Sequence, residues 1–373
     1  MIINSLSLVH FRNFLDSKID FNNRLNIIIG DNGQGKTNIL EALYLLTEGE
    51  SFRYSKNENL IKLGTPASFL RAEIENRDLK YKISMKVTSS KKELLVNEKP
   101  VSQSKLNFFS SVLFSPESLN IIKESSDERR LLIDQLVDHT TTNGYAVIRD
   151  YKKVLKSRNR LLKDISEQKI PYQMGKDTLD SLNSTFLKLA SELTYLRLTT
   201  LNEIRPEVEK AINNIHFSNS VNFDFKYIIS EVDHKQSDLQ QITESLQKRM
   251  LELEPAELKS GVSLVGPQKH DITFLYNGND SRFYCSQGQQ RSIILAYKMA
   301  QIVYHHRVHR FYPFLLLDDV LSELDLTKQE SLISTLNQTE TQTFVTSTDV
   351  SLLSKLSMNK ASVFKICGGQ IAN

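Results

Sequence analysis

The run Gly30-Asp31-Asn32-Gly33-Gln34-Gly35-Lys36-Thr37 matches the pattern of a phosphate-binding loop. It follows an apolar run, Leu25 to Ile29, and precedes a segment with helical periodicity from about Asn38 to Leu46. Small residues let backbone N–H groups turn toward a phosphate, and the start of a helix adds a favourable dipole. A glycine-rich turn without a ligand would explain the glycines but not the strand and helix around them. The run therefore predicts a nucleotide-binding α/β fold.

Each part of this loop has an expected role toward ATP and Mg²⁺. Lys36 is expected to reach the β- and γ-phosphates, and the hydroxyl of Thr37 is expected to bind Mg²⁺. The predicted nucleotide-binding residues of the loop are Gly30, Asp31, Asn32, Gly33, Gln34, Gly35, Lys36, Thr37 and Asn38.

A second candidate is the apolar run Phe314 to Leu317, which ends in two carboxylates. Asp318 is placed to hold Mg²⁺, and Asp319 is placed to orient or deprotonate the attacking water. An apolar strand that ends in Asp-Asp is weak evidence alone, because many strands lead into acidic loops. Here Ser322-Glu323-Leu324-Asp325 follows at the offset that ATP-binding cassette (ABC) ATPases use for a loop that contacts the opposite subunit.

The third motif, Ser286-Gln287-Gly288-Gln289-Gln290-Arg291, stands just before a long helix predicted from about Gly288 to Arg307. In ABC ATPases this position holds the signature motif, which binds the γ-phosphate of ATP held by the other subunit. An ordinary N-cap would explain the serine but not the order of the motifs along the chain. That order resembles ABC ATPases, which implies an ATP-dependent homodimer with Ser286, Gly288 and Gln289 at the partner's nucleotide.

Periodicity divides the chain into three segments. Residues 1–116 and 261–373 contain strand-like runs, whereas residues 117–260 are mainly helical, with a possible strand pair near Val221 to Ile229. Apolar residues recur at helical spacing from Leu179 to Leu196 and from Leu239 to Leu253, so two helices are expected to bury each other. A helix from Leu179 to Ile204 would be about 39 Å long, too short for the coiled coil of a chromosome-organising protein. The strand-like runs Asp271 to Tyr276 and Phe314 to Leu317 are expected to rejoin the N-terminal α/β part.

Composition excludes several classes of protein. No apolar run approaches a membrane span, and the first residues lack a secretion signal, which predicts a cytoplasmic protein that is not bound to a membrane. Two cysteines, Cys285 and Cys367, lack the spacing of metal ligands, so no structural zinc site is expected. Net charge is only +3, from 47 basic and 44 acidic residues, so a DNA-binding surface has to be local.

One basic helix face is the candidate DNA surface. Residues 149–163 contain seven basic residues and one acidic residue, and the basic residues Arg149, Lys153, Lys156, Arg160 and Lys163 recur at helical spacing. Such a face is usually only solvated. Because the same chain carries the ABC motifs, we favour contact with the DNA backbone by Arg149, Lys153, Lys156 and Arg160. No aromatic platform for stacking single strands stands out, so duplex contact is favoured and single-strand contact stays open.

Several further blocks resemble the bacterial RecF family along essentially the whole chain. They are Phe11-Arg12-Asn13-Phe14, residues 32–42, Ser51-Phe52-Arg53, residues 113–117, Arg129-Arg130, Ile133-Asp134, residues 158–163, Gly266-Pro267 and the signature Ser286 to Arg291. The resemblance implies an ABC-type, Rad50-like ATPase head with an inserted, mainly helical arm lobe. It also implies a nucleotide contact by Arg12, dimerisation on DNA when ATP is bound, and action at gaps and single-strand/double-strand junctions in DNA repair and replication. Its implied partners are mediators of the RecO and RecR kind and a RecA-type recombinase.

The chain departs from related ATPases at two catalytic positions. Thr348 stands where transport ATPases have a switch histidine, and no glutamine occurs at residues 115–117, where a Q-loop would be expected. A threonine can hydrogen-bond a γ-phosphate or water but cannot shuttle a proton near neutral pH. We therefore expect a weak, DNA-stimulated ATPase whose catalytic residues are Lys36, Ser286, Asp318, Asp319 and Thr348. The alternative is a nucleotide-gated structural DNA clamp of the SMC/Rad50 type with little hydrolysis. The ATPase subunit of a transporter would need both the switch histidine and the Q-loop glutamine, and this chain has neither at those positions.

Overall fold

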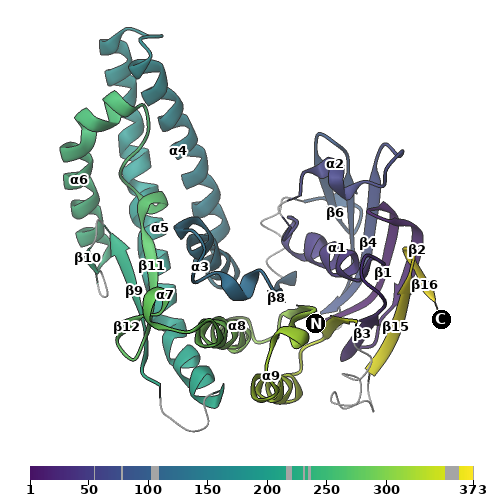
Figure 1. Cartoon of the computed structure of the whole chain (residues 1–373). Helices are drawn as coiled ribbons and strands as arrows, with labels where there is room; N and C mark the ends of the chain where they lie inside the picture. Colours follow the sequence, from purple (N-terminus) through teal and green to yellow (C-terminus); the bar gives the residue numbers. More distant parts are fainter. Residues whose placement is uncertain are drawn as a thin grey trace. The chain divides into compact units, whose positions relative to one another are not determined.

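The fold is that of a computed structural model, which describes residues 1–53, 55–76, 79–101, 109–215, 221–229, 232–233, 237–348 and 361–372. The chain forms two compact units (Figure 1). Unit 1 comprises Met1–Asn120 and Ile294–Asn373, and unit 2 comprises Ile121–Ile293. The boundaries predicted from the sequence lay at 116/117 and 260/261. The second boundary differs because residues 261–293 contain β11 (Asp271–Tyr276), which pairs along its length with β9 (Phe223–Ile229) of unit 2.

A largely parallel sheet forms the nucleotide-binding half of unit 1. Its strand order is β16-β15-β3-β14-β13-β8, and only β16 runs antiparallel to its neighbour. All five residues of β13 are buried, as expected for a central parallel strand covered on both faces. The strands are β3 (Leu25–Ile29), β8 (Ser111–Phe114), β13 (Phe314–Asp318), β14 (Thr343–Ser347), β15 (Ala361–Cys367) and β16 (Gln370–Ala372). The accompanying helices are α1 (Lys36–Glu48), α9 (Leu326–Gln338), η2 (Ser118–Asn120) and η4 (Val320–Glu323).

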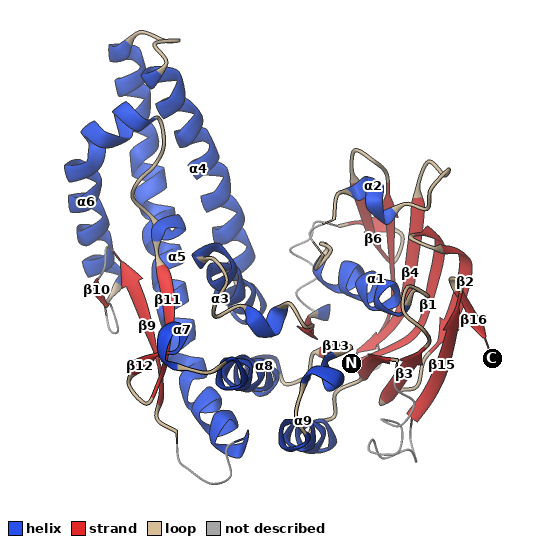
Figure 2. Ribbon diagram, in the orientation of Figure 1, coloured by secondary structure: helices blue, strands red, loops and turns tan. Residues whose placement is uncertain are grey.

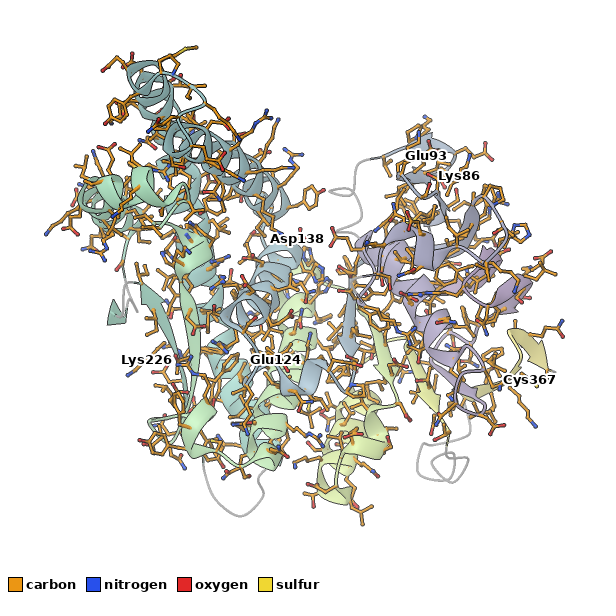
Figure 3. The ribbon with its side chains drawn as sticks, turned by 45° about the horizontal axis from the view of Figure 1, so that its top comes forward. Lys86, Glu93, Glu124, Asp138, Lys226 and Cys367 are labelled. Atoms are coloured by element: carbon orange, nitrogen blue, oxygen red, sulfur yellow. The ribbon has the colours of Figure 1, made fainter. Side chains whose placement is uncertain are left out.

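The second sheet of unit 1 is antiparallel, with the order β2-β1-β4-β5-β6-β7. Buried and exposed residues alternate along β4, so one face packs with α1 into a common core and the other faces solvent. On the solvent face Lys86 of β5 lies opposite Glu93 of β6 (Figure 3). The elements are β1 (Ile2–Phe11), β2 (Phe14–Asp20), α2 (Asn57–Leu60), β4 (Ser68–Asn76), β5 (Leu79–Val87), β6 (Lys92–Val96) and β7 (Lys99–Pro100).

Unit 2 is mainly helical, with a small sheet in the order β10-β9-β11-β12 (Figure 2). Its longest helices, α4 and α5, run side by side (Figure 1). Among the described residues, no helix combines the length and the apolar character needed to span a membrane. The elements are α3 (Ser126–Thr140), α4 (Gly144–Ser166), α5 (Tyr172–Ile215), β10 (Val232–Asp233), α6 (Leu239–Ser260), η3 (Pro267–Lys269), β12 (Asn279–Asp280), α7 (Ser281–Tyr284) and α8 (Gln287–His309), which continues into unit 1.

The helical insertion contains a longer helix than predicted, and its sheet includes a strand that was expected elsewhere. Helix α5 has 44 residues, which corresponds to about 66 Å. Of the first apolar series, Leu179, Phe186 and Leu193 are buried, and α5 packs against α6 as expected. The expectation that the C-terminal part rejoins the N-terminal α/β part is confirmed for residues 314–317, which pair with β8 and β14. It was wrong for residues 271–276, which pair with β9 of unit 2. Strand pairing depends on a partner distant in sequence, which the alternation within one strand does not reveal.

Several of the blocks quoted above build the interior of unit 2. Arg197 donates to Asp134 Oδ1 at 2.7 Å and to the carbonyl oxygen of Pro267 at 2.8 Å. Gly266 has a φ of +119°, and a Cβ atom there would lie 2.6 Å from the hydroxyl oxygen of Tyr151. The conformation and the close approach both require glycine. These blocks therefore fasten the segment before β11 to the helices.

Candidate nucleotide-binding site

The phosphate loop connects β3 to α1 in unit 1, as predicted. The Lys36 side chain is buried, and its Nζ atom donates to the carbonyl oxygens of Gly30, at 2.7 Å, and Asp31, at 2.9 Å. An ammonium group has three hydrogens, so two of these bonds leave one donor for a phosphate. Lys36 is thus held at the loop by the loop's own backbone.

Two neighbouring turns fix the conformation of this loop. Asn13, in the turn between β1 and β2, donates to the carbonyl oxygen of Gln34 at 2.8 Å and accepts from Asn38 at 2.8 Å. The backbone N–H of Gly369, between β15 and β16, donates to the same Gln34 oxygen at 3.1 Å. Gly35 has a φ of +115°, and a Cβ atom there would lie 2.7 Å from Asn13 Nδ2. The loop is therefore shaped by its surroundings and needs little reorganisation to bind a ligand.

Asp318 meets the loop at the carboxyl ends of three neighbouring strands, β3, β14 and β13. Its Oδ1 atom accepts from Thr37 Oγ1 at 2.8 Å and from Thr346 Oγ1 at 2.8 Å. Burial raises the pKa of Asp318, and the two hydroxyl donors act in the opposite direction. A divalent cation would favour the charged carboxylate. The donor set of a threonine hydroxyl and a carboxylate consists of the hard oxygen ligands that Mg²⁺ prefers.

Asp319 follows in a left-handed backbone conformation, with a φ of +52°. This conformation is uncommon for a residue other than glycine, and such residues cluster at functional sites. The backbone N–H of Asp319 donates to Thr346 Oγ1 at 3.0 Å. Burial raises the pKa of the Asp319 carboxyl, while the charge of Lys36 acts against this shift. A raised pKa makes the carboxylate a stronger proton acceptor.

Sequence reasoning selected Thr348 in this segment and missed Thr346. Thr346 is buried at the register position opposite Asp318, whereas Thr348 is exposed just beyond the end of β14. The available signal was the presence of small polar residues at positions 343, 346 and 347 of this segment. It did not identify Thr346, because the register between β13 and β14 is set by the fold.

Arg12 is held by an acidic residue of α1. Its guanidinium donates to Glu41 from Nε at 2.8 Å and from Nη2 at 2.6 Å, and Glu41 is completely buried. Arg53, another residue that was not selected, donates to Asn38 Oδ1 at 3.0 Å, and its charge lowers the pKa of Asp318. Two arginines therefore border the loop, and the nucleotide contact of Arg12 stays a prediction.

The signature motif begins α8 with a reciprocal cap. Gln289 N–H donates to Ser286 Oγ at 3.2 Å, and Ser286 N–H donates to Gln289 Oε1 at 2.8 Å. This is a capping box, so the predicted N-cap is present. Ser286 and Gly288 are exposed, and the Ser286 hydroxyl still has its own hydrogen to donate. Ser286, Gly288 and Gln289 belong to unit 2, whereas the groups around Lys36 belong to unit 1.

The predicted DNA-binding residues lie exposed on α4 of unit 2. Arg149 pairs with Asp150 at 2.8 Å, and Arg160 lies 3.9 Å from Asp164. Within the described ranges, Lys153 and Lys156 form no ion pair with an acidic residue, so the face keeps an excess of positive charge. A further basic residue of this helix, Arg158, is buried and therefore does not contribute to the face.

Comparison with known proteins agrees with this geometry. The sequence profile of the RecF/RecN/SMC N terminal domain family matches residues 2–368. The DNA replication and repair protein RecF of Bacillus subtilis is 34% identical, and that of Oenococcus oeni is 32% identical, each over the full length of both chains.

Solved structures give the same relationship. The structure of the recombination mediator protein RecF with ATP has a TM-score of 0.89 at 30% identity and covers 100% of this chain and 97% of that one. The Smc head domain of Pyrococcus furiosus has a TM-score of 0.54 at 16% identity over 99% of this chain and 95% of that one, which shows the fold alone. The predicted fold class, an α/β ATPase head of the Rad50-like and SMC-like kind with a helical insertion, is confirmed. The chain belongs to the RecF family of DNA replication and repair proteins.

Proposed function

We propose that this chain binds ATP and Mg²⁺, dimerises on ATP, and binds duplex DNA and single-strand/double-strand junctions at gaps. In this role it helps RecO- and RecR-type mediators to load a RecA-type recombinase. The observation that carries the proposal is the 2.8 Å hydrogen bond between Thr37 and Asp318, because it joins the phosphate loop to the acidic strand end. The full-length similarity to a RecF structure with ATP supports it.

The residues of unit 1 divide the work at the nucleotide. Backbone N–H groups of residues 30–38 bind the phosphates, and Lys36 reaches the β- and γ-phosphates. Thr37 and Asp318 hold Mg²⁺, which when bound neutralises phosphate charge. Asp319 orients the attacking water and accepts its proton, and Thr348 hydrogen-bonds water or the γ-phosphate. Because Thr348 stands where transport ATPases have a histidine that can shuttle a proton, ATP turnover is slow. Binding of DNA raises this turnover.

A Lys36→Ala protein tests the nucleotide site. We expect it to fold normally and to lose ATP-dependent dimerisation and ATP turnover, because the ammonium charge acts on the ligand. The matched control is Lys18→Ala, which removes an exposed lysine of the same unit and leaves both properties unchanged. Sedimentation and phosphate release are measured with and without gapped DNA. If a folded Lys36→Ala protein still dimerises on ATP, the nucleotide site is wrong. If gapped DNA fails to raise the ATP turnover of the wild-type chain, the alternative of a structural clamp with little hydrolysis is favoured.

The basic face of α4 has a separate test. Replacing Arg149, Lys153, Lys156 and Arg160 with glutamine is expected to weaken DNA binding for every sequence. Each lost phosphate contact flattens the slope of log affinity against log salt by about 0.9 on duplex DNA. The control replaces four other exposed lysines of unit 2, Lys188, Lys210, Lys248 and Lys259, and thus makes the same change in net charge. If the two variants have equal slopes of log affinity against log salt, the basic face of α4 is only solvated and does not contact DNA.

A further inference from the structure

Unit 2 contains a cavity of about 430 Å³ between α6 and the segment that precedes β11, and we call it the α6 cleft. Its lining residues come from positions 245–253 of α6, from positions 264–270 and from Ile229 at the end of β9. The volume lies within the range of about 300–1,000 Å³ that is typical of ligand pockets. These residues belong neither to the predicted nucleotide site nor to the basic face of α4. The proposed function therefore leaves the α6 cleft without a role.

Hydrogen bonds fix the walls of the α6 cleft. Glu257 of α6 is completely buried, and its Oε1 atom accepts from the backbone N–H of Leu264 at 2.7 Å and from that of Val265 at 3.3 Å. At the other end of the second wall, the carbonyl oxygen of His270 accepts from Arg130 at 2.5 Å. Because both walls are held before a ligand arrives, binding costs little ordering of the protein.

The charged side chains of the α6 cleft are mainly cationic. Lys248, Arg249 and Lys269 line it together with one carboxylate, that of Glu252. Arg249 pairs with Glu252 at 2.9 Å. Lys248 and Lys269 are exposed, and neither forms an ion pair with an acidic residue that the structure describes. Two ammonium groups without a carboxylate partner at one cleft favour an anionic ligand.

The apolar part of the α6 cleft is aliphatic. It consists of Ile229, Leu246, Leu253, Leu264 and Val265, and none of the described lining residues is Phe, Tyr or Trp. Proteins bind the bases of single-stranded nucleic acid mainly by stacking them on aromatic side chains, so this wall does not favour a nucleotide. An apolar centre with a charged rim is instead the anatomy of an interface between proteins. The lining therefore favours a peptide that carries both an apolar side chain and carboxylates.

We propose that the α6 cleft binds an acidic peptide segment of a partner protein. One apolar side chain of that segment packs against Leu246 and Leu253, and the carboxylates beside it pair with Lys248 and Lys269. All four residues belong to unit 2, so this binding requires neither ATP nor a second copy of the chain. The cleft goes beyond the proposed function, because it gives the chain a protein-binding site that is independent of nucleotide and DNA.

Fluorescence anisotropy of labelled peptides with the full chain tests the proposal. The probes are short peptides in which aspartates flank a leucine, an isoleucine or a phenylalanine. One control peptide has alanine at the centre, and another has serine in place of every aspartate. At low salt we expect at least one probe to bind, and we expect each of its controls to bind about tenfold more weakly. If no probe binds more tightly than its two controls, the proposal is wrong.

Two lysine variants locate the carboxylates of the probe. Lys248→Gln combined with Lys269→Gln is expected to weaken binding of the probe about tenfold. The matched control, Lys188→Gln combined with Lys210→Gln, makes the same change in net charge at exposed positions of α5 and leaves binding unchanged. Equal affinity of the two variants for the probe would rule out the cleft as the binding site.

Two leucine variants locate the apolar side chain of the probe. Leu253→Ala should weaken the leucine probe more than it weakens the alanine control peptide, because the two side chains contact each other. Leu251→Ala removes a side chain that is 66% exposed and does not line the cleft, so it leaves both affinities unchanged. Circular dichroism shows whether each variant is folded, and the lysine variants test the same cleft if Leu253→Ala is not. If a single-stranded oligonucleotide of thymidines displaces the probe and itself loses affinity in the lysine variant, the cleft binds single-stranded DNA and the proposal is overturned.

Discussion

A mixture of Lys36→Ala and Ser286→Arg proteins is expected to recover about a quarter of wild-type ATP turnover, although each protein alone is nearly inactive. In the proposed dimer, each composite site takes Lys36 from one subunit and Ser286 from the other. A mixed dimer then collects both lesions in one site and leaves the other site complete. Random pairing at equal concentrations makes half of the dimers mixed, and each of these has one active site of two.

The measurement is steady-state phosphate release in the presence of gapped DNA, after exchange of subunits has been shown. The structure supplies a matched control, a mixture of Lys36→Ala with Asp318→Asn. These two residues belong to the same unit and the same half-site, so both sites of a mixed dimer stay broken and no turnover returns. A mixture of the first pair that remains inactive despite subunit exchange would rule out action of Ser286 on the partner's nucleotide.

Arg158→Ala is expected to lower the free energy of unfolding by about 3–5 kcal/mol, the usual range for breaking a buried ion pair. Arg158 and Glu257 are both buried, and their charged groups lie 2.6 Å apart. The guanidinium also donates to Ser263 at 2.7 Å and lies 4.8 Å from the centre of the Phe186 ring. Removing it leaves the Glu257 carboxylate buried without its cation and leaves a cavity beside Phe186.

The matched control is Arg160→Ala, which removes the same side chain two residues later on the exposed face of α4. A surface change of this kind is expected to alter stability by less than about 0.5 kcal/mol. Urea unfolding followed by circular dichroism compares the two variants. DNA affinity is expected to show the reverse pattern: Arg160→Ala lowers it and Arg158→Ala does not, because only Arg160 belongs to the proposed DNA face. Equal stability of both variants would show that the Arg158 pair contributes nothing to the fold of unit 2.

Local patterns in the sequence predicted the parts of this protein whose chemistry depends on neighbouring residues. The phosphate loop needs a strand, small residues, a lysine and a helix in immediate succession, so Gly30 to Thr37 could be recognised without coordinates. The capping box at Ser286 spans only four residues. Each of these features is confined to a short stretch of chain.

Other features became visible only when distant segments came together. Thr346 acts on Asp318 across 28 positions of sequence, and the register between two strands brings them into contact. Arg158 is one of the seven basic residues between positions 149 and 163, but Glu257, 99 residues away, pairs with it inside unit 2.

The sequence by itself determined the motifs, their order and the class of fold, because these follow from local geometry and hydrophobic periodicity. Only the tertiary structure decided which strands pair, which charges are buried and which side chains line the α6 cleft. Burial and pairing are set by contacts between residues that no short pattern connects.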